Sequence, residues 1–338
     1  MNRIVKLALG CSAALALAAP AMAHHSAAAY NTQQKVTIKG TVTAYQFRNP
    51  HVYLTLTVKK DDGTSMPVGV EAGAASVLNG LGFNKDSLKA GDIVTIVGNP
   101  SRSKGEANVL GLDLYKLDGT YLPLNIASRS VYEVTTTQPA TSLAGTWFAP
   151  RQGFMGFLGG GRRWSLTDKG KAAQASFDPK ANIQKDCIPI GEPALMFYPV
   201  ANKIEVQKDK VIIKTDWMDS ERVIYTDGRK HPPASQTFLH GHSIGHWEGK
   251  ALVVDTTNFK DHPMGNSTAI PGSTQKHLTE KFALSEDAKS LDYSGTLEDP
   301  TYLNAPVQFS GKWEYRPTMP FSNQKCDLRI ARQFLTEE

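Results

Sequence analysis

Short segments that alternate apolar and polar residues dominate this sequence and limit its fold more than any other feature. Residues 36–42 and 52–58 both alternate in this way, which is the period of a half-buried β-strand. Turn-forming residues such as Asp61-Asp62-Gly63 separate these segments, and further strand-like segments follow at 66–71, 93–98 and 109–116. One short helix is expected near 74–81. Five short strands and one helix within about 100 residues predict a small closed barrel of the oligonucleotide/oligosaccharide-binding (OB) type.

A second set of strand-like segments begins after residue 143 and predicts a larger antiparallel barrel. It opens with Gly145-Thr146-Trp147, and lipocalin-like barrels begin with a Gly-x-Trp strand. Further strand-like segments follow at short spacing, at 211–217, 222–226, 251–259, 277–284, 291–297 and 307–315. Only 167–175 is expected to be helical, and the glycine-rich segment 154–163 is interpreted as a flexible loop, or else as a lid or a membrane-touching tip. The predicted fold class is all-β, an OB-like small barrel followed by a lipocalin-like β-barrel with few short helices.

The first 23 residues have the order of an export signal. A basic start is followed by the apolar run 7–19 and by the small-x-small site Ala21-Met22-Ala23. We therefore expect a signal peptide at 1–23, an OB-like barrel at 24–125, a linker at 126–142 and a lipocalin-like barrel at 143–338. The mature protein is expected to be periplasmic or secreted. No transmembrane segment is expected in it, because no later run of 18 apolar residues exists.

The cysteine content indicates the cellular compartment, and the net charge limits the classes of possible partner. Two cysteines remain after the signal, Cys187 and Cys326, and in an oxidising compartment they are expected to form one disulfide. Two unpaired buried thiols are the alternative. The 37 basic and 32 acidic residues give a net charge of +5, of which Arg3 and Lys6 of the signal contribute two. The remaining +3 is too weak to indicate nucleic acid as a partner. The expected partner is a small molecule, and the oligomeric state stays open.

The predicted mature chain begins with histidine and offers a candidate copper site. The amino group and the ring of His24 could both bind one Cu(II) ion, and His51 is a candidate for a further nitrogen ligand. In the alternative interpretation His24 is an exposed residue left beside the signal site, and His51 packs under a turn.

A histidine-rich segment in the second half gives another group of candidates. Alternation along a strand predicts that His240, His242, His246 and Glu248 share one face, opposite Trp247. A His-x-His pair such as His240 and His242 is a frequent way to present two imidazoles to zinc or a similar metal. His246 would lie too far along the strand for the same ion, so His277 or Glu280 would have to supply a third ligand.

The alternation at 277–282 places Glu280 on the same face as Leu278 and Phe282. If that face is the barrel interior, the carboxylate is paired with an arginine or a histidine, or its pKa is raised. Arg229, after the turn residues Asp227 and Gly228, is a candidate partner. Structural pairing, a metal site and a metal-free acid–base or ligand site remain open alternatives.

Both halves resemble families of exported bacterial domains whose function is unknown. For the first half the matching stretches are 24–26, 40–42, 49–53 and 88–100, and the resemblance covers almost all of 24–120. The second half, over about 143–330, resembles an uncharacterised lipocalin-like secreted family at 166–170, 187–189, 225–232, 241–249, 252–256 and 277–282. It departs from that family at Lys250, where an acidic residue is usual, and around Cys326. Neither family carries an assigned activity, so these resemblances imply domain boundaries and candidate positions only.

The main functional hypothesis is a binding protein that holds a small, partly apolar ligand in the C-terminal barrel. Arg229, His231, His246 and Trp247 are its candidate ligand-binding residues. The alternative is a lyase, isomerase or hydrolase, metal-assisted or not, with His242, His277 and Glu280 as catalytic residues. A second alternative is a copper-binding protein centred on His24 and His51.

Overall fold

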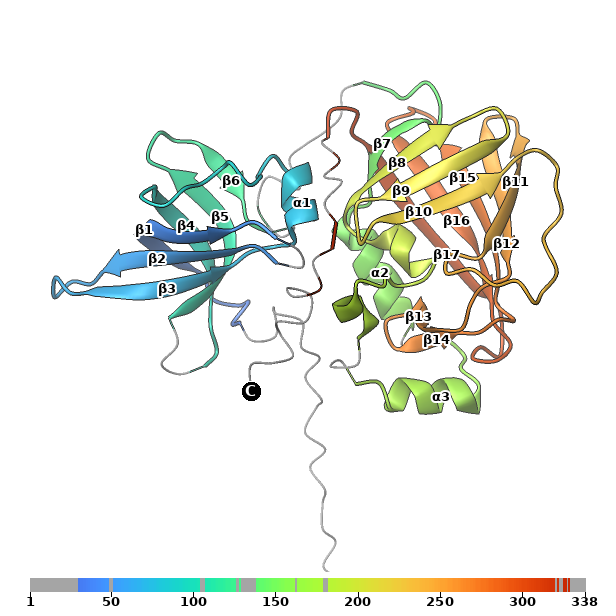
Figure 1. Ribbon diagram of the computed structural model, residues 1–338, viewed down its shortest axis with the longest axis horizontal. Helices are drawn as coiled ribbons and strands as arrows, with labels where there is room; N and C mark the ends of the chain where they lie inside the picture. Colours follow the sequence, from blue (N-terminus) through green and yellow to red (C-terminus); the bar gives the residue numbers. More distant parts are fainter. Residues whose placement is uncertain are drawn as a thin grey trace, which may run out of the picture.

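The computed structural model describes residues 30–48, 51–103, 107–125, 128, 138–161, 163–178, 182–319, 321, 325, 326 and 328. The predicted signal peptide and most of the predicted linker lie outside these residues. No helix within the described ranges is long and apolar enough to cross a membrane. Figure 1 shows a smaller β-structure formed by β1–β6 and a larger one formed by the strands from β7 onward.

The first β-structure is the predicted small closed barrel. Its sheet has the order β3-β2-β1-β4-β5-β6, and a parallel pairing of β3 with β5 closes it. The elements are β1 (Val36–Gln46), β2 (Tyr53–Lys59), β3 (Ser65–Glu71), α1 (Ala75–Gly80), β4 (Ile93–Pro100), β5 (Asn108–Lys116) and β6 (Tyr121–Pro123). Alternate residues of the strands, among them Leu54, Leu56 and Ile96, are fully buried and build its core. The alternation in the sequence therefore identified the buried face of these strands correctly.

The second β-structure is a closed barrel of nine strands in the order β10-β11-β12-β15-β16-β17-β7-β8-β9. Eight of its nine neighbouring pairs are antiparallel, as predicted, whereas β10 and β11 run parallel. The barrel strands are β7 (Gly145–Phe148), β8 (Ala201–Val206), β9 (Lys210–Thr215), β10 (Ser220–Tyr225), β11 (His242–Glu248), β12 (Ala251–Thr257), β15 (His277–Leu284), β16 (Ser290–Glu298) and β17 (Val307–Tyr315). A separate hairpin consists of β13 (His262–Ser267) and β14 (Ile270–Gly272).

Four short helical segments accompany this barrel, namely α2 (Arg151–Gly161), α3 (Asp168–Ala175), η4 (Ile183–Asp186) and η5 (Ala194–Phe197). The predicted helix near 167–175 is confirmed as α3, and the hydroxyl of Thr167 caps it by accepting from the amide of Gly170. The interpretation of 154–163 as a flexible loop is wrong over 154–161, which is helical in α2. The ring of Phe157 stacks on Phe197 at 4.6 Å, and this burial outweighs the low helix propensity of the glycines.

Aromatic side chains fill the interior of the nine-stranded barrel. Trp147 of the Gly-x-Trp strand is fully buried, and its indole donates to the carbonyl of Leu143 at 2.9 Å. Phe197 of η5 contacts Tyr293 and Phe309 at ring-centroid distances of 5.4 and 6.0 Å. The helix α2 and the segment η5 therefore bring aromatic rings into the same core as the strands.

The predicted disulfide between Cys187 and Cys326 is confirmed. It joins residues 139 positions apart, so it links the segment after η4 to the C-terminal part of the chain. A disulfide of this kind agrees with an oxidising environment outside the cytoplasm.

Candidate functional site

The parallel pairing of β10 with β11 creates the candidate site. Parallel neighbours cannot be joined by a tight hairpin, so residues 226–241 form a long crossover between them. We call this segment the crossover loop. It carries His231 to the outer surface of the barrel, where side chains from β11, β12, β15 and β16 lie.

Alternation along the strands decides which side chains reach that outer surface. Ser243, Thr256 and Leu278 are buried in the barrel interior, at 1%, 0% and 0% exposure. The residues directly before them, His242, Asp255 and His277, therefore point outward. Glu298 stands opposite His277 in the antiparallel pair of β15 and β16.

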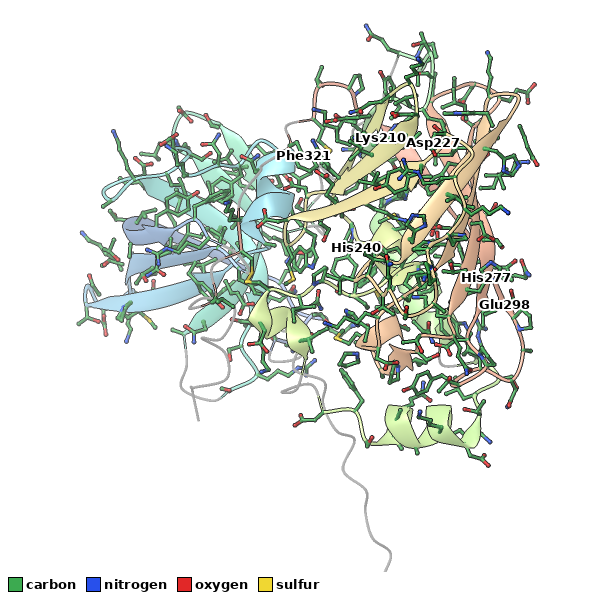
Figure 2. The ribbon with its side chains drawn as sticks, turned by 45° about the vertical axis from the view of Figure 1, so that its right-hand side comes forward. Lys210, Asp227, His240, His277, Glu298 and Phe321 are labelled. Carbon is green, nitrogen blue, oxygen red and sulfur yellow. A yellow bond between two sulfur atoms is a disulfide. The ribbon has the colours of Figure 1, made fainter. Side chains whose placement is uncertain are left out.

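Five of these side chains form one continuous chain of polar contacts, which we call the histidine–carboxylate chain. Nδ1 of His242 lies 3.0 Å from Nδ1 of His231, whose Nε2 lies 2.8 Å from Oδ1 of Asp255. The second oxygen of Asp255 lies 2.8 Å from Nε2 of His277, and Nδ1 of His277 lies 3.1 Å from Oε2 of Glu298. Figure 2 shows His277 and Glu298 at neighbouring positions on one side of the larger barrel.

The contacts define one arrangement of the protons when His231 is neutral. The Asp255 carboxylate can only accept, so Nε2 of His231 donates to it, and Nδ1 of neutral His231 is then an acceptor. With His231 neutral, Nδ1 of His242 donates to His231, and Nε2 of neutral His242 is left unprotonated. Among the described residues, Nε2 of His242 has no hydrogen-bond partner. It is a basic nitrogen open to a ligand.

Within the histidine–carboxylate chain, the pKa of His277 is raised, whereas the pKa values of Asp255 and His242 are lowered. Hydrogen bonding to Asp255, aided by Glu298, raises the pKa of His277 above 6.5, although burial opposes this. The same bond with His277 is the largest cause of the lowered pKa of Asp255. Burial, with the charges of His231 and Arg229, lowers the pKa of His242 below 6.5. The surroundings therefore favour the neutral form of His242 and the protonated form of His277.

Aromatic groups surround the ring of His242. Tyr225 stacks against it at 5.4 Å with an interplanar angle of 24°, and Phe238 lies at 6.1 Å. The guanidinium of Arg229 lies 3.7 Å from the centre of the Tyr225 ring. Phe238 is 41% exposed, so an apolar surface lies beside the His242 ring.

Glu280 belongs to a different, buried group. As predicted, it shares the interior face with Leu278 and Phe282, and it forms an ion pair with an arginine. That arginine is Arg222 of β10, whose Nη1 donates to Oε1 of Glu280 at 2.9 Å. The hydroxyl of Tyr293 also donates to Oε1, and Ser243 and Thr256 accept from Arg222. Glu280 therefore does not join His242 and His277 in one site.

The suggestion that Arg229 pairs with Glu280 is wrong. Arg229 donates from Nη2 to Asp227 at 2.6 Å on the surface, because the turn 227–229 brings the two side chains together. Arg222 occupies the position by Glu280 instead, since its side chain points inward from β10.

His240 and His242 do not form the predicted metal-binding pair. Gly241 has a φ of 68°, a conformation that ends the strand alternation before His240. Nδ1 of His240 lies 2.8 Å from Oε1 of the fully buried Glu192, away from the histidine–carboxylate chain (Figure 2). Among the described residues, no group of three or more His, Cys, Asp or Glu is arranged to hold a metal ion.

Glu192 and Lys276 form a second buried charged group. Burial alone would raise the pKa of Glu192, but the charge and hydrogen bond of His240, with Arg222 and Lys276, lower it to about 2. Nζ of Lys276 donates to the carbonyl oxygens of Glu192 and Gly265, and burial lowers the pKa of Lys276 to about 8. This group anchors the end of the crossover loop through His240.

The other predicted site residues lie away from the histidine–carboxylate chain. His246 is 3.6 Å from Glu248 at the far end of β11, and Trp247 beside it is 41% exposed. His51 lies in the small barrel, where Nδ1 is 3.1 Å from the carbonyl oxygen of Ala72 and 3.4 Å from Oε1 of Glu71. His24 lies outside the described residues, so its role in copper binding stays a prediction.

Sequence reasoning did not include Asp255, Glu298, Arg222 or Glu192. Alternation within 251–257 could have placed Asp255 on the outer face, because Val254 and Thr256 on either side suit the interior. No sequence signal could place His231 beside it, because the contact depends on the parallel pairing of β10 with β11.

One family model matches the N-terminal part of the chain. Residues 13–110 match the model of DUF6152, a family of unknown function. This agrees with the resemblance of the N-terminal domain to an uncharacterised family. Comparison with curated proteins finds no match.

Proposed function

We propose that the C-terminal barrel is an enzyme in which Nε2 of His242 acts as a general base on a small substrate. The observation that carries this proposal is the chain of contacts from Asp255 through His231 to His242. With His231 neutral, this chain leaves Nε2 of His242 unprotonated, and Nε2 has no hydrogen-bond partner among the described residues.

When His242 takes a proton from a bound water or a weakly acidic substrate group, it becomes an imidazolium ion. Its Nδ1–H continues to donate to His231, and the Asp255 carboxylate beyond His231 stabilises the new positive charge. The lowered pKa of His242 keeps the base neutral before the reaction. His277 holds the other oxygen of Asp255 and so fixes the carboxylate in place.

The surroundings favour the outer surface over the barrel interior as the substrate site. Rings from α2, η5, β16 and β17 pack against one another inside the barrel, which leaves the carrier hypothesis with less support. The exposed ring of Phe238 offers an apolar contact beside His242. We therefore place a partly apolar substrate against Phe238.

The same proposal places the protein in the periplasm or outside the cell, where its disulfide is stable. We also propose that the second domain is related to the lipocalin-like secreted family that it resembles. The nine-stranded closed barrel and its Gly-x-Trp strand support that hypothesis. The parallel pair β10 and β11 distinguishes this barrel from an up-and-down arrangement.

Hydrolysis of p-nitrophenyl acetate tests the proposal without knowledge of the natural substrate, because this activated ester reports an accessible basic imidazole. We expect His242→Ala to lower the protein-catalysed rate about 100-fold or more, in line with the contribution of one general base. His246→Ala is the matched control, since His246 lies on the same strand and its side chain is 68% exposed. Equal rates for the wild-type protein and His242→Ala would refute the proposal.

A further inference from the structure

Asn258 connects the strand that carries Asp255 to the crossover loop that carries His231. It follows β12 directly, three residues after Asp255. Its side-chain amide nitrogen lies 3.3, 3.0 and 2.9 Å from the carbonyl oxygens of Pro232, Pro233 and Gln236. Its own carbonyl oxygen accepts from the amide of Phe238 at 2.9 Å. One residue therefore holds the loop at four points.

The conformation of Asn258 suits this role. Its φ of 57° lies in the left-handed region, which asparagine tolerates better than most residues. The hydroxyl of Thr257 donates to Oδ1 of Asn258 at 2.8 Å, which orients the amide so that its nitrogen faces the loop. The residue is only 7% exposed, so its hydrogen bonds to the loop are shielded from water.

The loop segment that Asn258 holds is stiff. Two consecutive prolines follow His231, and each fixes its own φ. A residue before proline is itself restricted to extended conformations, so the backbone of His231 has little freedom. Fixing the carbonyl groups of Pro232 and Pro233 therefore fixes the imidazole of His231 between Asp255 and His242.

We propose that Asn258 is a positioning residue that selects the tautomer of His242 by holding His231 in contact with both Asp255 and His242. This inference rests on the proposed function, because the selected tautomer is the one that leaves Nε2 of His242 basic. Asn258 does not touch the substrate. It acts through the crossover loop and His231 alone.

The test is the tautomeric state of His242, measured from imidazole nitrogen chemical shifts in ¹⁵N-labelled full-length protein at pH 7.5. Asn258→Gly removes the three side-chain bonds, and glycine adopts the positive φ without strain. We expect the wild-type protein to carry the proton on Nδ1. In Asn258→Gly we expect a substantial population with the proton on Nε2, the tautomer that free histidine prefers.

Asp219→Gly is the matched control. Asp219 also has a positive φ, of 55°, but it lies in the turn between β9 and β10 and is exposed. This control should keep the wild-type tautomer. Asn258→Asp is a second variant. Its carboxylate has the size of the asparagine amide, but an acceptor oxygen replaces the nitrogen that donates to the three carbonyl groups. We expect it to lose the Nδ1–H tautomer as Asn258→Gly does.

The outcomes separate the inference from the proposed function. If the wild-type protein itself carries the proton on Nε2 of His242, the proposed function fails. If the wild-type protein carries it on Nδ1 and both Asn258 variants keep it there, the proposed function stands and the role of Asn258 is refuted. A shift of the proton in both variants, with none in Asp219→Gly, supports the inference.

Discussion

Nδ1 of His242 lies 3.0 Å from Nδ1 of His231, so one of these two nitrogens carries a proton and the other accepts it. Asp255 decides between them when His231 is neutral, because its carboxylate accepts a hydrogen bond from the opposite nitrogen of His231. The two residues reach each other from different parts of the chain, one from the crossover loop and one from the first position of β11. Because of this contact, the half-exposed polar residues form the continuous histidine–carboxylate chain.

The charge of Asp255 should control the titration of His277. In Asp255→Asn the pKa of His277 should fall toward 6.5, since the bond to Asp255 is the largest cause of its raised value. Proton NMR titration of the His277 ring measures this directly. Glu298→Gln should produce a smaller fall, and an unchanged pKa in Asp255→Asn would contradict the assigned contact.

Protonation of His277 should also appear in the pH dependence of stability. A raised pKa in the folded state means that the stabilisation is fully present below about pH 6.5, the unfolded value. It is then lost as the pH rises through the raised folded value. Urea unfolding between pH 5 and 9 should show this decline in the wild-type protein. His277→Ala should show a weaker decline, and an equal one would exclude His277 as its source.

The buried pair of Arg222 and Glu280 should matter for folding rather than for chemistry. Removing one partner leaves an uncompensated buried charge, so Glu280→Gln should cost about 3–5 kcal/mol in urea unfolding. The exposed pair of Lys281 and Glu248 is the control, and Lys281→Ala should cost less than about 1 kcal/mol. Folded Glu280→Gln protein should retain the esterase rate of the wild-type protein. Loss of that rate without loss of stability would instead support a catalytic role for Glu280.

The copper hypothesis makes a separate prediction about the small barrel. The hydroxyl of Tyr30 donates to Glu71 at 3.1 Å, and Glu71 lies 3.4 Å from His51. His24 precedes Tyr30 by six residues, so it is within about 20 Å of this point along an extended chain. Protein that begins at His24 should bind one Cu(II) ion in calorimetric titration, and one added residue before His24 should weaken that binding sharply. Equal affinities would remove the amino group of His24 from the site.

Much of the architecture was accessible from the sequence because strand alternation reports burial directly. The inward direction of Glu280 followed from Leu278 and Phe282 on the same face. Its partner did not follow, because the approach of Arg222 depends on how β10 is placed in the barrel. Likewise, the glycines of 154–161 obscured a helix that exists because Phe157 is buried against Phe197.

The candidate site was only half predictable for the same reason. His231, His242 and His277 stood out because histidine is uncommon and chemically versatile. Asp255 and Glu298 did not, since single acidic residues on strands are ordinary surface residues. Only the register that sets His277 opposite Glu298, and the crossover that carries His231 outward, give these carboxylates a role.

In the proposed function, Nε2 of His242 is the free basic nitrogen of the site. The most direct measurement is the imidazole ¹⁵N spectrum of His242 in the wild-type protein at pH 7.5. We expect a proton on Nδ1, a deprotonated Nε2, and loss of this pattern in His231→Ala. A proton on Nε2 in the wild-type protein would contradict it.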